Sequence, residues 1–438
     1  MKTLPIQTPG RRPLSALPPL ALYVHLPWCL RKCPYCDFNS HEAREEIPQR
    51  RYVDALVADL EAALPLVWGR RVHSVFLGGG TPSLFEPERI ADLLDAIRAR
   101  VPLAAEVEIT MEANPGTFEA GRFRGFGEAG VNRLSIGVQS FDDARLAALG
   151  RVHGGGEARA AVRAALDLFA RVNVDLMYAL PGQDALAAAR DVSIALDLGV
   201  RHLSAYQLTL EPNTVFHLRP PVLPDEAQAA CIEEAVHGAL AAGGLARYEV
   251  SAFAVPGEEA RHNLNYWTFG DYLGIGAGAH GKLSLPDRLF RQVRHRQPRQ
   301  YMESALSGDA RASEEDIPAQ RLPFEFMLNA LRLEQGVPPA MFEERTGLGL
   351  SAIARALAEA LDRGLLDPDP RVLRASELGY RFLNDLVELF LPEEDPPVAG
   401  TDVPPAIEQP RARRDASREG GDTVSGSPPG SRASGGRA

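Results

Sequence analysis

The sequence has few cysteines and no long apolar run. Only four of its 438 residues are cysteine, too few for a disulfide framework in a chain of this size. No stretch of eighteen apolar residues occurs, so we expect no transmembrane segment. A signal peptide is not expected either, because Pro13, Pro18 and Pro19 interrupt the apolar stretch that follows Arg11 and Arg12. These absences favour a cytoplasmic protein with reduced thiols.

Positive charge is also scarce. The chain has 47 Lys and Arg residues against 58 Asp and Glu residues, a net charge of -11. Without a basic stripe, neither a nucleic acid nor an anionic membrane surface is the expected partner. Partners are therefore expected to be small molecules or proteins. With 45% of its residues apolar, the chain is expected to fold. Its length predicts one large domain and a smaller one.

The cysteines are clustered. Cys29, Cys33 and Cys36 follow a short apolar run at Cys-x3-Cys-x2-Cys spacing. Three thiolates leave the fourth position of a tetrahedral centre open, and an open position on a metal takes an exchangeable ligand or substrate. We therefore predict a metal centre on these three residues.

A structural zinc ion is the alternative for this cluster, with His25 or His41 as the fourth ligand. Zinc sites usually combine one Cys-x2-Cys pair with a second, distant pair. No second pair exists here, since the remaining cysteine, Cys231, stands alone in a predicted helix. Buried, unligated thiols are the other alternative.

Residues 21–207 alternate between short β-type runs and helical stretches. The predicted strands are 21–26, 72–77, 106–112, 132–138, 172–178 and 201–207. The predicted helices between them include 48–64, 86–99, 156–170 and 184–198. Six βα units in series predict a parallel sheet.

Polar residues gather at the carboxyl ends of these predicted strands. They are the cysteines, Gly78 to Thr81, Glu112 and Asn114, Gln139, Asp175, and Tyr206 with Gln207. Convergence from six strand ends is typical of a barrel-type active face. The predicted fold class is therefore α/β, with a partial (β/α)6 TIM-like barrel.

The rest of the chain completes the predicted domain organisation. Beyond the barrel we expect a helix over 224–242, a strand over 247–254 and helices over 316–334, 338–345, 350–363 and 376–390. Their order predicts a mainly helical, winged-helix-like domain. The predicted parts are an N-terminal arm (1–20), the barrel (21–210), a barrel-completing region that contains the motif around His262 (211–310), the helical domain (311–391) and a disordered tail (392–438). The tail has too few large apolar side chains to offset its ordering entropy.

The cysteine spacing after a first barrel strand resembles the radical S-adenosylmethionine (SAM) superfamily. This resemblance implies a [4Fe-4S] cluster on the three thiolates, with the amino and carboxylate groups of SAM on the open iron. It implies that the SAM-binding side of the site includes Tyr23, Gly79, Gly80, Thr81, Glu112, Gln139, Arg151 and Asp175. Taken singly, Glu112 could also cap a helix and Arg151 could be a surface charge. Asp175 stands in an apolar strand, where a carboxylate is costly without a partner.

The resemblance narrows further on several motifs. They are YVHLPWC, CPYCDFNSH, GGGTPS, MEANPG, LSIGVQSF, DLMYALPGQ and LTLEPNT. Together they resemble the coproporphyrinogen oxidase-like branch over roughly residues 20–285. The oxidases of that branch carry a fourth cysteine two positions after the third, where this chain has Phe38, and a longer N-terminal extension. In both features this chain resembles the HemW-type heme chaperones instead.

The stretch Arg261 to Trp267 is similar to the His-Asn-x-x-Tyr-Trp motif of that type, in which the histidine is associated with heme. The resemblance implies heme bound at His262, with His280 as a second candidate. A hydrogen-bonded core histidine is the alternative, since a buried imidazole needs a partner in any case. An imidazole is a good axial ligand, and the adjacent aromatic residues offer flat apolar area.

Two functions follow from these resemblances. The first is a heme chaperone that carries the cluster and SAM and delivers heme to an acceptor protein. This function is compatible with an electron donor and with transient contact with a membrane-bound acceptor. The second is an oxygen-independent coproporphyrinogen III oxidase in porphyrin biosynthesis. Because of Phe38 we favour the first and expect no coproporphyrinogen oxidase activity. Whether SAM is cleaved stays open.

Overall fold

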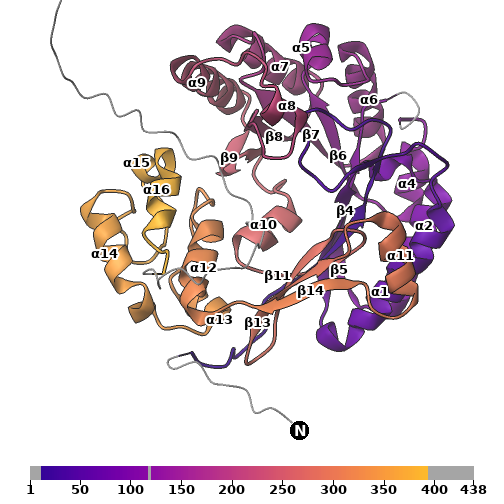
Figure 1. Cartoon of the computed structure of the whole chain (residues 1–438). Coiled ribbons are helices and arrows are strands. Elements are labelled where there is room, and N and C mark those ends of the chain that lie inside the picture. The colour runs from indigo at the N-terminus through magenta and orange to yellow at the C-terminus, as the bar shows by residue number, and fades with distance from the viewer. Residues whose placement is uncertain (1–10, 117–119, 393–438) are drawn as a thin grey trace, which may run out of the picture. The chain divides into compact units, whose positions relative to one another are not determined.

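One twelve-stranded sheet dominates the protein (Figure 1). The structure, a computed structural model, describes residues 11–116 and 120–392. Six parallel strands form the middle of the sheet: β1 (Leu20–Leu26), β4 (Val72–Gly79), β5 (Leu103–Ala113), β6 (Arg133–Gln139), β7 (Arg171–Tyr178) and β8 (His202–Gln207). Each coincides within a few residues with a predicted strand. The predicted α/β class with a partial (β/α)6 barrel is confirmed.

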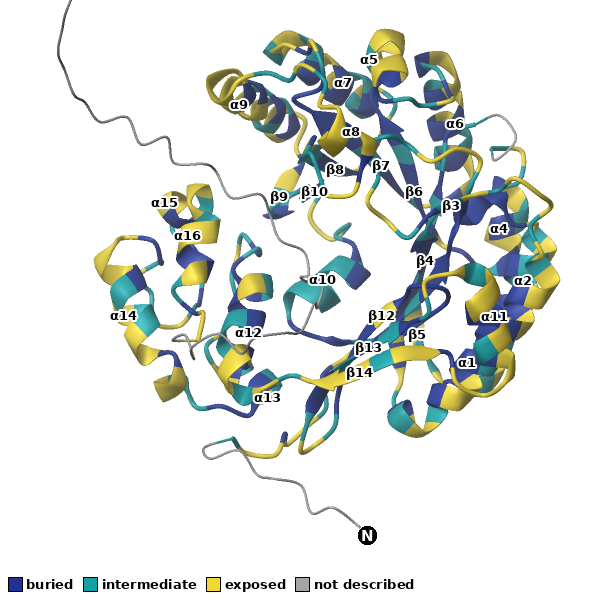
Figure 2. Cartoon of the chain, viewed as in Figure 1, coloured by how far each residue is buried: buried dark blue, intermediate teal, exposed yellow. Residues whose placement is uncertain are grey.

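Helices connect these strands and cover the outer face of the sheet (Figure 1). They are α1 (Gln49–Val67), α2 (Pro87–Arg100), α4 (Phe123–Ala129), α5 (Asp143–Ala148), α6 (Gly155–Leu168) and α7 (Ala185–Asp197). Helix α6 shows why they pack there: Ala158, Ala161, Val162 and Ala165 are all buried and recur on one helical face. Figure 2 shows the six core strands mostly buried and the outward sides of the helices exposed.

The sheet continues past both ends of the six-stranded core. Beside β8 lie β10 (Ala252–Ala254) and β9 (Ala246–Glu249). Beside β1 lie β11 (Asp271–Ile275), β12 (His280–Ser284), β13 (Leu289–Arg294) and β14 (Arg311–Asp316). The single strand predicted over 247–254 is wrong, because the chain reverses at residues 250–251 without a Gly or Pro to mark the turn.

Further helices follow β8. They are α8 (Val215–Leu218), α9 (Glu226–Ala242), α10 (Arg261–Trp267) and α11 (Pro298–Leu306). Helix α10 contacts β1, β4 and β11 and lies on the opposite side of the sheet from α2 and α4 (Figure 1). It therefore faces the barrel interior.

The C-terminal part is mainly helical, as predicted. It comprises α12 (Leu322–Ala330), α13 (Ala340–Thr346), α14 (Ala354–Asp362), α15 (Glu377–Arg381) and α16 (Leu383–Glu388), with short 3-10 turns at Ala319–Arg321 and Leu350–Ala352. Another 3-10 turn, Pro82–Leu84, follows β4 in the barrel. The single helix predicted over 376–390 is broken at Phe382, whose φ of -116° and ψ of 44° are not helical. The helix predicted over 316–334 begins only at Leu322, because Ile317 still bonds to Leu289 of β13.

A second core holds these helices together. Phe269, Phe326 and Phe342 are fully or almost fully buried in it. The described part of the N-terminal arm joins this core, since Leu14 is buried there and the Arg12 N–H donates to the Gly347 carbonyl at 2.8 Å. The predicted disordered tail lies, apart from residue 392, outside the described residues, and the predicted domain limits stay a prediction. Among the described helices, none has the length and apolarity needed to cross a membrane.

A buried ion pair joins α1 to the added strands. Asp59 accepts hydrogen bonds from Arg294 Nε at 2.9 Å and from the Tyr301 hydroxyl at 3.0 Å. Both charged side chains are almost fully buried. This pair links α1, β13 and α11, which are far apart in the sequence.

We expect Asp59→Asn to lower the free energy of unfolding by about 3 kcal/mol, because the Arg294 guanidinium would stay buried without its counter-charge. Urea unfolding followed by circular dichroism measures this change. Arg299→Ala, which removes the exposed pair with Glu303, is the control and should change stability by less than about 0.5 kcal/mol. Equal effects of the two variants would contradict a stabilising role for the buried pair.

Candidate functional site

The three clustered cysteines lie in a loop after β1 whose two ends are joined. Strands β2 (Trp28–Cys29) and β3 (His41–Glu42) pair with each other and close the loop. Within it the Cys36 N–H donates to the Cys33 carbonyl at 3.1 Å. All three thiols are free and half-buried. The loop therefore holds the sulfur atoms near the carboxyl ends of the strands.

Each cysteine sulfur lies beside a polar group, which for Cys29 and Cys33 comes from outside the cysteine loop. Thr81 Oγ1 donates to Cys29 Sγ at 3.5 Å, and Arg151 Nη1 donates to Cys33 Sγ at 3.4 Å. The third sulfur, on Cys36, lies 3.6 Å from the Ser40 hydroxyl. Burial raises the pKa of Cys29 to about 11, so a bound metal must displace the thiol proton.

The arrangement of the thiols fits a polynuclear cluster better than one zinc ion. A zinc ion needs its ligands around a single point. No three His, Cys, Asp or Glu side chains converge in that way in the parts of the chain that the structure describes. In a [4Fe-4S] cluster each cysteine thiolate ligates a different iron, so the sulfur atoms need not converge on one point, and the polar groups beside the three sulfurs suit such a cluster.

Arg151 lies at the centre of this hydrogen-bond network. Its Nη2 donates to Asn114 Oδ1 and to the Gly137 carbonyl, both at 2.7 Å, and Asn114 Nδ2 donates to Thr81 Oγ1 at 2.8 Å. Its Nε is buried and has no partner among the described residues. Arg151 is thus not a surface charge, and the unpaired N–H suits an anionic group of a ligand. Asn114 was assigned no role from the sequence, although this residue follows a strand end within the MEANPG motif.

The glycine run allows β4 to pass close to the cysteine loop. A Cβ on Gly79 would lie 2.5 Å from the His25 ring, and one on Gly80 would lie 2.5 Å from the Trp28 carbonyl. The N–H groups of Gly79, Gly80 and Thr81 already donate to Glu112, Leu26 and Trp28, respectively. These N–H groups are thus hydrogen-bonded within the protein, and the glycines allow the two segments to approach closely. SAM binding by Gly79, Gly80 and Thr81 stays a prediction.

Two carboxylates lie inside the barrel below this loop. Glu112 Oε2 accepts from the Gly79 N–H at 2.9 Å. Asp175 accepts from Asn173 at 2.8 Å and from Ser135 at 3.2 Å, so it has the partners that its apolar strand requires. Burial raises the pKa of both carboxyl groups, that of Glu112 to about 7.

Gln139 and Tyr23 complete the predicted SAM set. Gln139 ends β6 with a φ of 69°, unusual for a residue with a side chain, and accepts from the Tyr206 hydroxyl at 2.9 Å. The Tyr23 hydroxyl lies 2.7 Å from His25 Nδ1, and its ring stacks on Phe76. The structure thus places the predicted residues on five neighbouring strands and the loops that follow them. Phe38, in the cysteine loop, is 61% exposed.

His262 lies in the same interior, nearer to the amino-terminal ends of the parallel strands than the cysteine loop. Its Nδ1 is 3.2 Å from Glu108 Oε1, and its ring packs on Phe76 with 4.4 Å between ring centroids. Glu108 precedes Glu112 by four residues on β5, a separation of ~13 Å along a strand. The second candidate, His280, is exposed at the first residue of β12. Glu108 was not predicted as a site residue from the sequence, because no motif marks it.

Glu108 is an ionised carboxylate. Burial alone would raise the pKa of this group, but the hydrogen bond with His262 and the positive charge of Arg133 lower it to about 2. The Arg133 side chain is also buried, with its Nε 2.9 Å from Glu108 Oε2. The negative charge beside the imidazole is therefore permanent at physiological pH.

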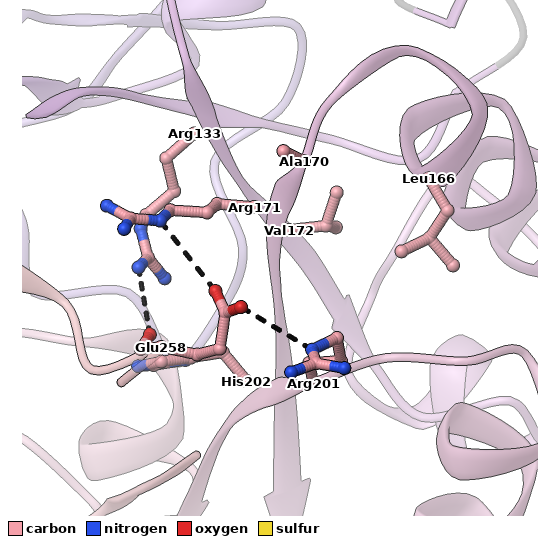
Figure 3. Close-up of a pocket in the computed structure, with 8 residues that line it drawn as sticks. All are labelled: Arg133, Leu166, Ala170, Arg171, Val172, Arg201, His202 and Glu258. Atoms are coloured by element: carbon pink, nitrogen blue, oxygen red, sulfur yellow. Dashed lines mark hydrogen bonds and ion pairs between the residues drawn. The ribbon is translucent and has the colours of Figure 1, made fainter. Parts of the chain in front are cut away.

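A small pocket lies at the opposite end of the strands from the cysteines (Figure 3). Arg133, Arg171 and Arg201 surround Glu258 there, and the Glu258 carbonyl accepts from Arg133 Nη2 at 2.8 Å. The pocket has a volume of about 10 Å³, enough for about one water molecule. The pocket is therefore too small for an organic ligand. The hydrogen bond to the Glu258 carbonyl holds the Arg133 side chain in place.

Comparisons with known proteins agree with this site. The Radical SAM superfamily model matches residues 23–186, and the HemN C-terminal domain model matches residues 317–382. The solved structure of the Escherichia coli coproporphyrinogen III oxidase, described as a radical SAM enzyme, has the same fold: the TM-score is 0.72 at 23% identity, covering 85% of this chain and 90% of that one. Fold and cysteine loop together define a radical SAM protein.

The curated relatives are more specific. The heme chaperone HemW of Escherichia coli is 50% identical over 86% of this chain and 99% of its own length, and that of Haemophilus influenzae is 45% identical over 87% and 100%. A mouse mitochondrial protein named for its radical SAM domain is 38% identical over 87% and 89%. This chain belongs to the HemW family.

We expect Glu112→Gln to stabilise the apo protein at pH 8 by about 3 kcal/mol and to have little effect at pH 4.5. Between the unfolded pKa of 4.5 and the folded pKa of about 7, the folded state keeps a proton that the unfolded state has lost. Wild-type stability therefore falls as the pH rises through this window. Urea unfolding at several pH values measures the difference. The exposed Glu128→Gln is the control, and a pH-independent difference would contradict the assignment.

Proposed function

We propose that this protein is a cytoplasmic heme chaperone, which binds heme and delivers it to an acceptor protein. The observation that carries this proposal is the placement of His262, whose imidazole is held through Nδ1 by a buried carboxylate. Such a partner is typical of histidines that ligate a metal through their other nitrogen. The names of its relatives support the same function.

The cysteine loop would hold a [4Fe-4S] cluster through Cys29, Cys33 and Cys36. When bound, the cluster supplies an electron and an open iron position to SAM. The residues of this chain would bind and orient SAM: Tyr23, Gly79, Gly80, Thr81, Glu112, Gln139, Arg151 and Asp175. The unpaired Nε of Arg151 suits a carboxylate. The carboxylate oxygens of Asp175, which accept hydrogen bonds within the protein, can also accept them from hydroxyl groups.

The partners remain those implied by the sequence. Heme and a heme acceptor are required, and an electron donor and transient contact with a membrane-bound acceptor are compatible with the fold. Coproporphyrinogen oxidation is not proposed, because the chain has Phe38 where the related oxidases carry a further cysteine. The likeness to the solved oxidase, at 23% identity, concerns the fold alone.

For the cluster, we expect Cys33→Ala to lose the broad visible absorption near 400 nm and the iron content that anaerobic reconstitution with iron and sulfide produces. Two remaining thiolates at this loop hold the cluster too weakly to keep it. Cys231→Ala, which removes the exposed cysteine on α9, is the control and should retain both signals. Full iron and sulfide content in Cys33→Ala would contradict the assignment.

For the heme, we expect hemin added to the reconstituted protein to shift its Soret band, and we expect His262→Ala to abolish that shift. The exposed His280→Ala is the matched control and should behave as the wild type. The same preparation, assayed with coproporphyrinogen III and SAM under reducing conditions, should form no protoporphyrinogen. Efficient conversion would overturn the chaperone function in favour of the oxidase.

A further inference from the structure

Glu108 contacts both the start of α10 and Arg133 of β6. Its Oε1 lies 3.2 Å from His262 Nδ1 and accepts from the Arg261 backbone N–H at 2.8 Å. Its Oε2 accepts from Arg133 Nε at 2.9 Å. The side chain has no exposed surface. One carboxylate on β5 therefore fixes both the backbone and the imidazole of the α10 motif.

The other ring nitrogen of His262 is left available. Nε2 has no hydrogen-bond partner among the described residues, and it is not among their fully buried polar atoms that lack one. The side chain keeps 11% of its surface exposed. Phe76 packs against the ring and limits its rotation. A carboxylate at Nδ1 favours the tautomer with the proton on Nδ1, which leaves a lone pair on Nε2.

We propose that Glu108 is a positioning residue for the heme ligand: it holds the Nδ1–H of His262 so that Nε2 ligates the heme iron. This inference rests on the proposed function. The negative charge next to the imidazole makes it a stronger donor and stabilises ferric over ferrous iron. Arg133 keeps this charge in place, and its own position is fixed by the carbonyl groups of Glu258 and Glu259.

A purely structural role is the competing explanation, because Glu108 also binds the first backbone N–H of α10. Glu108→Gln separates the two roles. The amide oxygen of glutamine can still accept from the Arg261 N–H, so the start of α10 is kept. The amide has no negative charge, so the electronic effect on His262 is lost.

The experiment uses the full-length, cluster-reconstituted protein with hemin as the probe. We expect Glu108→Gln to weaken ferric hemin binding by about 10-fold to 100-fold. If the ferric form loses tenfold more affinity than the ferrous form, the heme midpoint potential rises by about 59 mV. Spectroelectrochemical titration of the Soret band measures this potential. A Soret position like that of the wild type shows that His262 still ligates the iron, so the shift then reports the lost charge and not a displaced ligand.

Asp59→Asn is the matched control, because it makes the same change at a buried carboxylate paired with an arginine elsewhere in the protein. It should leave the heme potential unchanged. If Glu108→Gln does not fold, the double variant Glu108→Gln/Arg133→Gln removes the uncompensated charge and carries the same expectation. A hemin affinity and potential equal to those of the wild type would overturn the role of Glu108.

Failure of the proposed function gives a different result. If His262→Ala binds hemin with an unchanged spectrum, the ligand assignment itself is wrong, and the role of Glu108 falls with it. If His262→Ala loses the Soret shift while Glu108→Gln behaves like Asp59→Asn, only the positioning role is overturned. Loss in His262→Ala together with a raised potential in Glu108→Gln supports both.

Discussion

The ion pair between Glu108 and Arg133 is the interaction on which the interior of the barrel depends. A charged group far from water costs several kcal/mol unless a counter-charge and hydrogen bonds compensate it. Here the two side chains lie on adjacent strands, β5 and β6, and both are almost fully buried. Because Glu108 also bonds to the start of α10, the same pair places that helix against the sheet. The position of His262 follows from it.

Strand β5 connects two levels of the site. Glu112, near its carboxyl end, contacts the glycine run beside the cysteines, and Glu108, one level below, contacts His262. A paired strand in the middle of a sheet is rigid, so the distance between the two levels is set by the backbone. Different environments give the two carboxyl groups opposite properties: burial raises the pKa of Glu112, whereas neighbouring donors and the Arg133 charge keep Glu108 ionised.

The part of the site around the cysteines also depends on other residues. The three sulfurs lie beside Thr81, Arg151 and Ser40; Ser40 belongs to the cysteine loop, and Thr81 and Arg151 come from two other loops. Hydrogen bonds to cysteine sulfur atoms are among the features that set the reduction potential of an iron–sulfur cluster. Asn114 links two of these groups, so the loops after β4, β5 and β6 act on the cysteine loop together.

Local patterns in the sequence determined the parallel core and the cluster-forming loop. A period-2 run followed by a helical period needs only neighbouring residues to be recognised, and Cys29, Cys33 and Cys36 lie within eight residues. The same logic missed the turn at residues 250–251 and the break at Phe382, where no Gly or Pro marks the change. Strand β11 beside β1 was also not predicted, because this pairing joins residues about 250 positions apart.

The partners of each site residue were decided only by the tertiary structure. The sequence alone showed that Asp175 needs a partner and that His262 stands in a distinctive motif. It did not show that Asn173 and Ser135 bond to the first or that Glu108 bonds to the second. Glu108 and His262 are 154 positions apart, and their contact exists only because β5 and α10 meet in the folded sheet. Hydrogen bonds act over about 3 Å, so which groups are partners is a property of the fold.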